Sequence, residues 1–269
     1  MFEINEKMYN ALLDIGRDQY IKNKSSEFAE KYPDRQSCIG YEKIEEFMYK
    51  VWEKAEYYNL PSDKEFNILV MLMCFWGCDF DIDPQYPWAR LKRFVDTKPA
   101  PRCTESESLR ALTTIYHEFY RVYKKIVGKN FSYVIHAYKN ITNLKFYDFI
   151  SFHDDSDVLT LLSKIYPEKR TYLREYIFYN DIIPAAKQKS SLYQLDSKIG
   201  TSILTVLIFT CGISFDTDPL CYTLNKKLTD NALPGMQKEQ ALFARAQELV
   251  AANLRCLTLS EENSHDAKK

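Results

Sequence analysis

The sequence predicts an all-α protein in which two tandem pseudo-symmetric helical repeats pack into one compact body. Apolar residues recur at helical spacing along most of the 269 residues, and no segment alternates polar and apolar residues between turn signals. In addition, the segment from Leu60 to Lys92 returns 135 positions later with about a third of its residues identical. Because this shift is close to half the chain length, a tandem duplication is the simplest explanation.

Helical periodicity places the elements of the first repeat in order. A first helix is expected around residues 4–15, where apolar residues follow one another at spacings of four, four and three. A second covers residues 44–55, which carry a wide apolar stripe opposite charged residues. Ser62 and Glu65 form the capping-box pattern that starts a third helix, and Gly77 marks its end. This third helix is apolar on most faces, so we expect it to be central and buried.

The remaining helices extend the same order into the second repeat. The last helix of the first repeat is expected to open at a capping box, Thr104 with Glu107, and to end near Gly128. Residues 197–212 correspond to the buried third helix of the first repeat. An apolar stripe over residues 242–257 predicts a C-terminal helix that corresponds to the helix ending at Gly128.

The repeat boundaries divide the chain into residues 1–130, residues 131–262 and a flexible tail of residues 263–269. The tail is short of apolar side chains, which is typical of frayed ends. No Gly/Ser-rich or Pro-rich linker separates the repeats, and residues 129–156 between them contain several aromatic side chains. We therefore expect the two repeats to share one hydrophobic core.

Bulk composition argues against several functional classes. A formal net charge of -1 argues against a protein that binds nucleic acid through a basic surface. Only 7 glycines are present and no glycine-rich phosphate-binding motif occurs, which disfavours Rossmann and P-loop enzymes. The 7 cysteines include no Cys-x-x-Cys pair, and no signal-peptide pattern or membrane-length apolar run is present. We expect a cytoplasmic protein with reduced thiols, no membrane contact, no cofactor and no metal.

The strongest chemical candidates are two acidic loops, Asp79–Pro84 and Ser214–Pro219, in which carboxylates alternate with other residues. An EF-hand calcium loop does not fit, because its sixth and twelfth positions would hold Pro84 and Arg90 instead of Gly and Glu. An Asp-x-Asp magnesium or manganese site would follow a strand and have glycines nearby, whereas this loop follows a predicted helix. A divalent-metal-dependent enzyme that uses the paired loops stays the alternative hypothesis.

A structural role explains the two acidic loops better. A glycine precedes each loop at the position where the end of a helix is expected. Asp83 and Asp218 each stand before a proline, and Asp-Pro is a favourable N-cap and N1 pair for a short helix. Phe80 and Phe215 are then expected to anchor each loop in the core.

Other reactive side chains have simpler explanations than catalysis. Cys74 and Cys78 suit a pair of buried free thiols in an apolar helix, because soft-metal sites recruit more ligands. The four histidines show no metal-binding spacing. The acidic stretch 153–157 is expected to cap the following helix through Asp155 or Ser156.

Without a catalytic constellation, the predicted function is a non-enzymatic protein-binding module. The 20 tyrosines favour a contact surface, because tyrosine is enriched at binding hot spots. In its helical, glycine-poor and tyrosine-rich character the chain resembles helical immunity proteins of bacterial toxin systems, including those that accompany type VI secretion effectors. This resemblance implies a cytoplasmic antitoxin that binds its cognate effector tightly and blocks the active site of that toxin.

The residues expected to contact such a protein partner lie in and beside the acidic loops. Carboxylates there are suited to mimic a substrate phosphate or to pair with basic residues of a nuclease-like toxin. The expected contact residues are Asp79, Asp81, Asp83, Trp88, Asp216 and Asp218. A helical scaffold or adaptor with no toxin involved is a third hypothesis beside the antitoxin and the metal-dependent enzyme.

Overall fold

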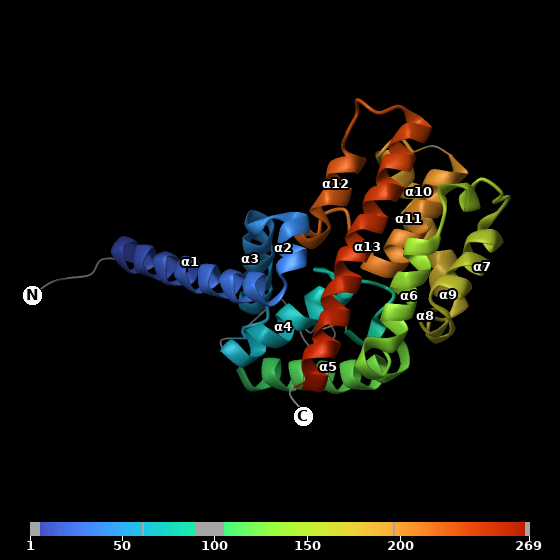
Figure 1. Ribbon diagram of the computed structural model, residues 1–269. Coiled ribbons are helices and arrows are strands. Elements are labelled where there is room, and N and C mark those ends of the chain that lie inside the picture. Colours follow the sequence, from blue (N-terminus) through green and yellow to red (C-terminus); the bar gives the residue numbers. More distant parts are fainter. Residues whose placement is uncertain (1–5, 61, 90–104, 196, 267–269) are drawn as a thin grey trace, which may run out of the picture.

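The structure, a computed structural model, describes residues 6–60, 62–89, 105–195 and 197–266 (Figure 1). Within these ranges every regular element is helical and no strand occurs, which confirms the all-α prediction. The helices up to residue 126 are α1 (Glu6–Lys31), α2 (Pro33–Ile39), α3 (Tyr41–Tyr57), α4 (Asp63–Trp76), η1 (Pro87–Ala89) and α5 (Glu105–Ile126).

The later helices contain several short 3₁₀ or π segments, labelled η, between the α-helices. They are η3 (Lys129–Phe131), α6 (Ser132–Asn143), η4 (Phe146–Phe149), α7 (Asp155–Ile165), α8 (Pro167–Tyr172), α9 (Glu175–Ile177), η5 (Phe178–Ile182), α10 (Ile183–Leu192), α11 (Lys198–Cys211), η6 (Pro219–Cys221), α12 (Tyr222–Leu228) and α13 (Gly235–Asp266). None of the helices in the described ranges is both long and apolar enough to cross a membrane.

Helices α4 and α11 are the buried helices that the sequence predicted. Ser62 caps α4 in the expected capping box with Glu65, and Ser197 caps α11 by accepting a hydrogen bond from the backbone N–H of Gly200. Both helices are 14 residues long, and each ends at a glycine, Gly77 or Gly212. Because most of their side chains face other helices, their apolar faces form the centre of the core.

The long helices α5 and α13 connect the two parts of the chain. Helix α5 packs against α8, while α13 runs the length of the body and packs against α2 and α6 (Figure 1). One hydrophobic cluster contains residues from both parts, from Ile21 on α1 to Val250 on α13. The segment between the predicted repeats also joins this core, because Phe149 of η4 is buried beside Phe243 of α13.

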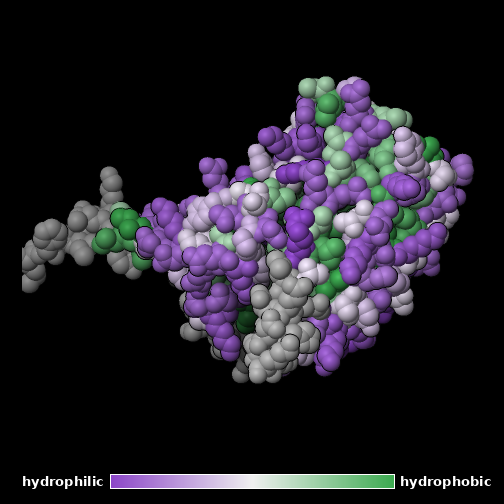
Figure 2. Space-filling model, viewed as in Figure 1, coloured by the Kyte–Doolittle hydropathy of each residue, from purple (hydrophilic) through white to green (hydrophobic). Residues whose placement is uncertain are grey.

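Helix α1 differs from the other long helices, because only its C-terminal part lies against the body. Its last turns pack against α2 and α3, whereas its N-terminal part extends away from the other helices (Figure 1). Leu12, Leu13 and Ile15 on this extension are 56%, 54% and 65% exposed. Figure 2 shows hydrophobic residues near the free end of this helix.

Several predicted helix ends shift in the structure. The expected flexible tail begins at residue 263, but α13 continues to Asp266, because intrahelical hydrogen bonds need no apolar stripe. Residues 267–269 and the expected cap Thr104 lie outside the described residues. Helix α7 is capped by Asp154 instead of Asp155 or Ser156, because its side chain reaches the backbone N–H of Ser156.

Candidate functional site

The acidic loops hold two carboxylates, Asp81 and Asp216, in equivalent surroundings. Lys189 Nζ donates to Asp216 Oδ1 at 2.6 Å and Tyr193 OH donates to Asp216 Oδ2 at 2.8 Å. The residues 135 positions earlier, Lys54 and Tyr58, donate to Asp81 in the same way. Each lysine and tyrosine comes from the last two turns or the end of α10 or α3, the helix that precedes α11 or α4. The two carboxylates therefore fasten the loop after α4 to α3 and the loop after α11 to α10.

Asp83 and Asp218 tie the two loops to each other. Asp83 Oδ1 accepts from the N–H of Gln85 at 2.9 Å, and its Oδ2 accepts from the N–H of Ile213 in the other loop at 2.8 Å. Asp218 makes the corresponding bonds from the second loop. Its Oδ1 accepts from the N–H of Leu220 at 2.8 Å, and its Oδ2 accepts from the N–H of Cys78, just before the first loop, at 3.0 Å. Each aspartate thus stabilises its own turn and the start of the opposite loop.

The two loops approach so closely that each requires a glycine. Gly77 and Gly212 have φ angles of 91° and 97°, a region that favours glycine. A Cβ atom on Gly77 would lie 3.0 Å from the carbonyl oxygen of Cys211, and one on Gly212 would lie 2.8 Å from that of Trp76. The ends of α4 and α11 therefore meet backbone to backbone at the centre of the molecule.

The predicted capping role is confirmed for Asp218, which is the N-cap of η6. Asp83 makes the equivalent bond to its own loop, but Pro84 and Gln85 form a turn instead of a short helix. Phe80 and Phe215 are 0% and 1% exposed, as expected for anchors. Burial raises the pKa of both capping carboxyl groups above the ordinary aspartate value, and their backbone hydrogen bonds oppose the rise.

The structure buries most of the residues that were predicted to contact a partner. Asp81, Asp83, Asp216 and Asp218 are only 1% to 4% exposed, and their oxygens accept hydrogen bonds within the protein. A partner protein would have to break these bonds and rehydrate the loops before it could reach them, which makes them unsuitable as a contact surface. Only the remaining two predicted contact residues, Asp79 and Trp88, keep partial exposure. Sequence alone could not reveal the burial of the four aspartates, because it depends on contacts with residues that are distant in the chain.

The first loop also borders an open groove of about 510 Å³ between α3 and the loop, lined by Lys50, Lys54, Asp79 and Asp81 among others. The Asp81 oxygens in this groove are already bonded to Lys54 and Tyr58. Asp83 faces the opposite loop instead of the groove. Among the described residues, no group of three or more His, Cys, Asp or Glu side chains is arranged to hold a metal ion.

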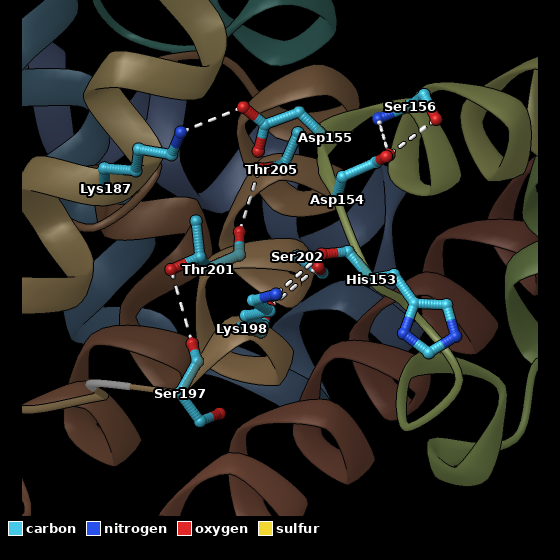
Figure 3. A network of polar contacts seen from close by, with 10 residues as sticks. All are labelled: His153, Asp154, Asp155, Ser156, Lys187, Ser197, Lys198, Thr201, Ser202 and Thr205. Atoms are coloured by element: carbon cyan, nitrogen blue, oxygen red, sulfur yellow. Dashed lines mark hydrogen bonds and ion pairs between the residues drawn. The ribbon is translucent and has the colours of Figure 1, made fainter.

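A polar network at the start of α7 contains the acidic stretch 153–157 (Figure 3). Asp154 accepts from Ser156, Lys187 of α10 donates to Asp155 at 2.9 Å, and Lys198 of α11 donates to the backbone carbonyl of His153 at 2.6 Å. The His153 imidazole makes none of the contacts drawn in Figure 3. The network therefore fastens α7 to α10 and α11, as expected of a helix start.

Sequence reasoning missed a cavity of about 120 Å³ between helices from both parts of the chain. Its walls come from α1, α2, α4, α6, α8, α11 and α13 and the segments between them, so residues far apart in the chain converge there. Most of the lining is aromatic or aliphatic, with Phe28, Phe75 and Tyr138 among its residues. Arg35 and Lys169 also line it and are its two basic side chains within the described structure. Their convergence depends on the helix crossings, which periodicity does not specify.

Burial lowers the pKa of Lys169, the lysine that lines the cavity. Lys169 is 2% exposed, and loss of hydration lowers its pKa to about 8, an effect that the nearby Asp83 opposes. Its Nζ donates to Tyr86 OH at 2.6 Å and to the backbone carbonyl of Phe209. Both acceptors are neutral, so the charge of Lys169 is not cancelled by a direct ion pair.

Comparisons with known proteins add no family assignment. No protein-family model matches the chain, and neither a curated protein nor a solved structure is significantly similar to it. The functional interpretation therefore rests on the geometry of this chain.

Proposed function

We propose that the protein is a non-enzymatic binding module that engages a partner protein through the free end of α1. The observation that carries the proposal is the exposure of Leu12, Leu13 and Ile15 on a helix that extends away from the body. Apolar side chains on such a helix support helix-in-groove recognition, in which the partner supplies an apolar groove. The three side chains cover a wide arc of the helix, which suits a groove that wraps around it.

Charges near this patch favour apolar recognition over electrostatic attraction. Arg17 pairs with Asp14 at 3.1 Å and with Asp18 at 3.2 Å, so these three side chains leave only one uncancelled negative charge on the helix surface. The N-terminal part of α1, here called the arm, therefore exerts only weak long-range electrostatic attraction on a partner. Affinity would depend on buried apolar contact and on shape complementarity.

The specific form of the proposal is a cytoplasmic immunity protein that binds a cognate bacterial toxin and blocks its active site. The helical, tyrosine-rich composition supports this form. The contact surface that we propose lies on α1 instead of the acidic loops, because the loop carboxylates already have partners within the protein. An adaptor would use the same arm, and the two differ in whether the partner is toxic alone.

We also propose that the body consists of two tandem pseudo-symmetric repeats, residues 1–130 and 131–262. Matching backbone details support the repeat. Asn59 and Gln194, 135 positions apart, have φ angles of 51° and 56° just before α4 and α11. The packing of α5 on α8 is matched by that of α13 on α2, in which each long helix covers the short helix of the other half. The binding arm would then be an addition to a symmetric body.

The decisive experiment combines Leu12→Asp and Ile15→Asp and measures binding to the protein encoded beside this gene. Wild type should form a stable complex and suppress growth inhibition by the partner. The double variant should bind at least about a hundredfold more weakly, because charges would enter an apolar contact. Its melting temperature should be unchanged, because both side chains are exposed.

Tyr147→Asp is the matched control, because Tyr147 is 74% exposed on η4 in another part of the molecule. This variant should bind like wild type. Equal binding by the arm variant would contradict the proposed surface, and a toxic neighbour that wild type does not suppress would contradict the immunity role. Sedimentation of wild type as a dimer and of the arm variant as a monomer would instead assign the arm to self-association.

A further inference from the structure

The cavity lined by Arg35 and Lys169 contains polar groups that make no hydrogen bond with the described part of the protein. Arg35 Nε, Trp76 Nε1 and Asn253 Oδ1 are buried and have no hydrogen-bond partner in the described structure. All three residues line the same cavity. Buried polar atoms in native proteins almost always have a partner, which is protein, water or ligand. Three such atoms around one cavity therefore point to an occupant that accepts from two of them and donates to the third.

The cavity also carries positive charge. No carboxylate lies within ion-pair distance of Arg35 or Lys169 in the part of the chain that the structure describes. The carboxylates that interact with them at longer range, Asp218 and Asp83, hold backbone N–H groups of the loops. An arginine stays charged at all physiological pH values, so the cavity favours an anion.

The walls limit the shape of that anion. Phe28, Tyr32, Phe75, Tyr138 and Tyr166 surround the space with aromatic faces and edges. At about 120 Å³, the cavity is slightly smaller than the roughly 150 Å³ engineered cavity that binds benzene. One six-membered ring is therefore the largest apolar body that fits without rearrangement. Tyr32, Arg35 and Asn253 retain partial exposure, so the cavity can be reached from the side of α2 and α13.

We propose that this cavity binds a small aromatic carboxylate, with its carboxylate held by Arg35 and its ring enclosed by the aromatic walls. Carboxylate and guanidinium form charge-assisted hydrogen bonds that are stronger than neutral ones. A ring hydroxyl would donate to Asn253 Oδ1, the unsatisfied acceptor. This site is separate from α1 and does not depend on the proposed partner.

The test uses the full chain and follows binding by calorimetry and by melting temperature. The probes are benzoate, 4-hydroxybenzoate, the neutral benzyl alcohol and acetate. Benzoate should bind saturably and raise the melting temperature, and 4-hydroxybenzoate should bind more tightly. Benzyl alcohol should bind about tenfold or more weakly, because it lacks the charge-assisted bonds. Acetate should have no effect, because it fills none of the apolar space.

Arg35→Met separates a ligand-binding role from a structural one. Without ligand, this variant should melt close to the wild-type temperature, because Arg35 makes no ion pair or side-chain hydrogen bond within the described structure and Met keeps the apolar packing of its stem. Its affinity for benzoate should fall about tenfold or more, while its affinity for benzyl alcohol should be unchanged. Arg121→Met is the control, because the Arg121 side chain on α5 is 60% exposed, and it should leave both affinities at the wild-type value.

A second measurement keeps the proposal testable if Arg35→Met does not fold. In the wild-type protein, the indole N–H resonance of Trp76 should shift on addition of benzoate, whereas that of Trp52, outside the cavity, should stay in place. The Asn253→Leu variant should lose the preference for 4-hydroxybenzoate over benzoate. Absence of saturable binding, an unchanged Trp76 resonance or equal affinity for benzoate and benzyl alcohol would overturn the proposal.

Discussion

Asp83 and Asp218 have the same kinds of hydrogen-bond partners in the two halves, whereas Arg35 and Lys169 do not. Both cations occupy corresponding positions, because each follows a Tyr-Pro pair by two residues. Lys169 donates to the carbonyl of Phe209 and to Tyr86 OH. The residues 135 positions away from these two acceptors are cysteines on the Arg35 side, and Arg35 makes no side-chain hydrogen bond in the described structure.

This contrast separates the parts of the molecule that support the fold from those suited to a ligand. The aspartates recur with their contacts because both loops need the same bonds to turn and meet. Around the cations, Cys221 stands 135 positions from Tyr86 and offers no phenol, so the Arg35 guanidinium lacks the kind of acceptor that Lys169 has. Positions at which the halves differ are therefore where recognition is expected, and those at which they agree are where stability is expected.

The largest expected effect concerns Asp83 and Asp218, the aspartates that each bond to the opposite loop, and tests whether the two are equivalent. Asp83→Ala and Asp218→Ala should each lower the free energy of unfolding by about 2–4 kcal/mol, because each leaves buried N–H groups in both loops without an acceptor. Urea denaturation measures the change. Asp79→Ala, in the same first loop but partly exposed, should cost less than about 0.5 kcal/mol. If either Asp83→Ala or Asp218→Ala were as stable as this control, the two aspartates would not be equivalent.

A smaller effect is expected for Asp81 and Asp216, the carboxylates that hold the two loops to α3 and α10. Asp81→Ala and Asp216→Ala should each cost about 1–3 kcal/mol, because a lysine and a tyrosine lose their shared acceptor. The two costs should agree within about 0.5 kcal/mol if the surroundings are energetically equivalent. An unchanged stability for Asp81→Ala, together with loss of an activity that requires a divalent metal, would instead favour the enzyme hypothesis.

A third expected effect is a pH dependence that belongs to Lys169 and has no counterpart at Arg35. Its folded pKa of about 8 lies below the unfolded lysine value of about 10.4. Between these values the unfolded chain binds more protons, so the contribution of Lys169 to the free energy of unfolding rises with pH and is lost as pH falls through about 8. Lys169→Met should remove this part of the slope.

Denaturant titrations from pH 7 to pH 10 measure that slope as a difference between wild type and variant. Lys187→Met is the control, because Lys187 is 57% exposed and pairs with Asp155 at the surface. It should leave the slope unchanged. Identical slopes for wild type and Lys169→Met would contradict this prediction, because they would show that the pKa of Lys169 is not lowered in the folded protein.

Local signals in the sequence predicted much of the framework. The capping box at Ser62, the glycine that ends α4 and the buried stripe on α3 all follow from interactions within one or two helical turns. The Asp-Pro pair was correctly assigned to chain geometry for Asp218. Its second bond, to the N–H of Cys78, joins residues 140 positions apart and leaves no local pattern.

By itself, the sequence determined the all-helical class and the helix starts and ends that depend on neighbouring residues, because helical hydrogen bonds and caps are short-range. Only the tertiary structure decided that the acidic loops are buried, that their aspartates cross between them, and that Arg35 and Lys169 face one cavity. Helix crossing angles set these contacts, and they arise from side-chain packing between distant segments. The same packing leaves the apolar end of α1 uncovered, which periodicity alone would have assigned to the core.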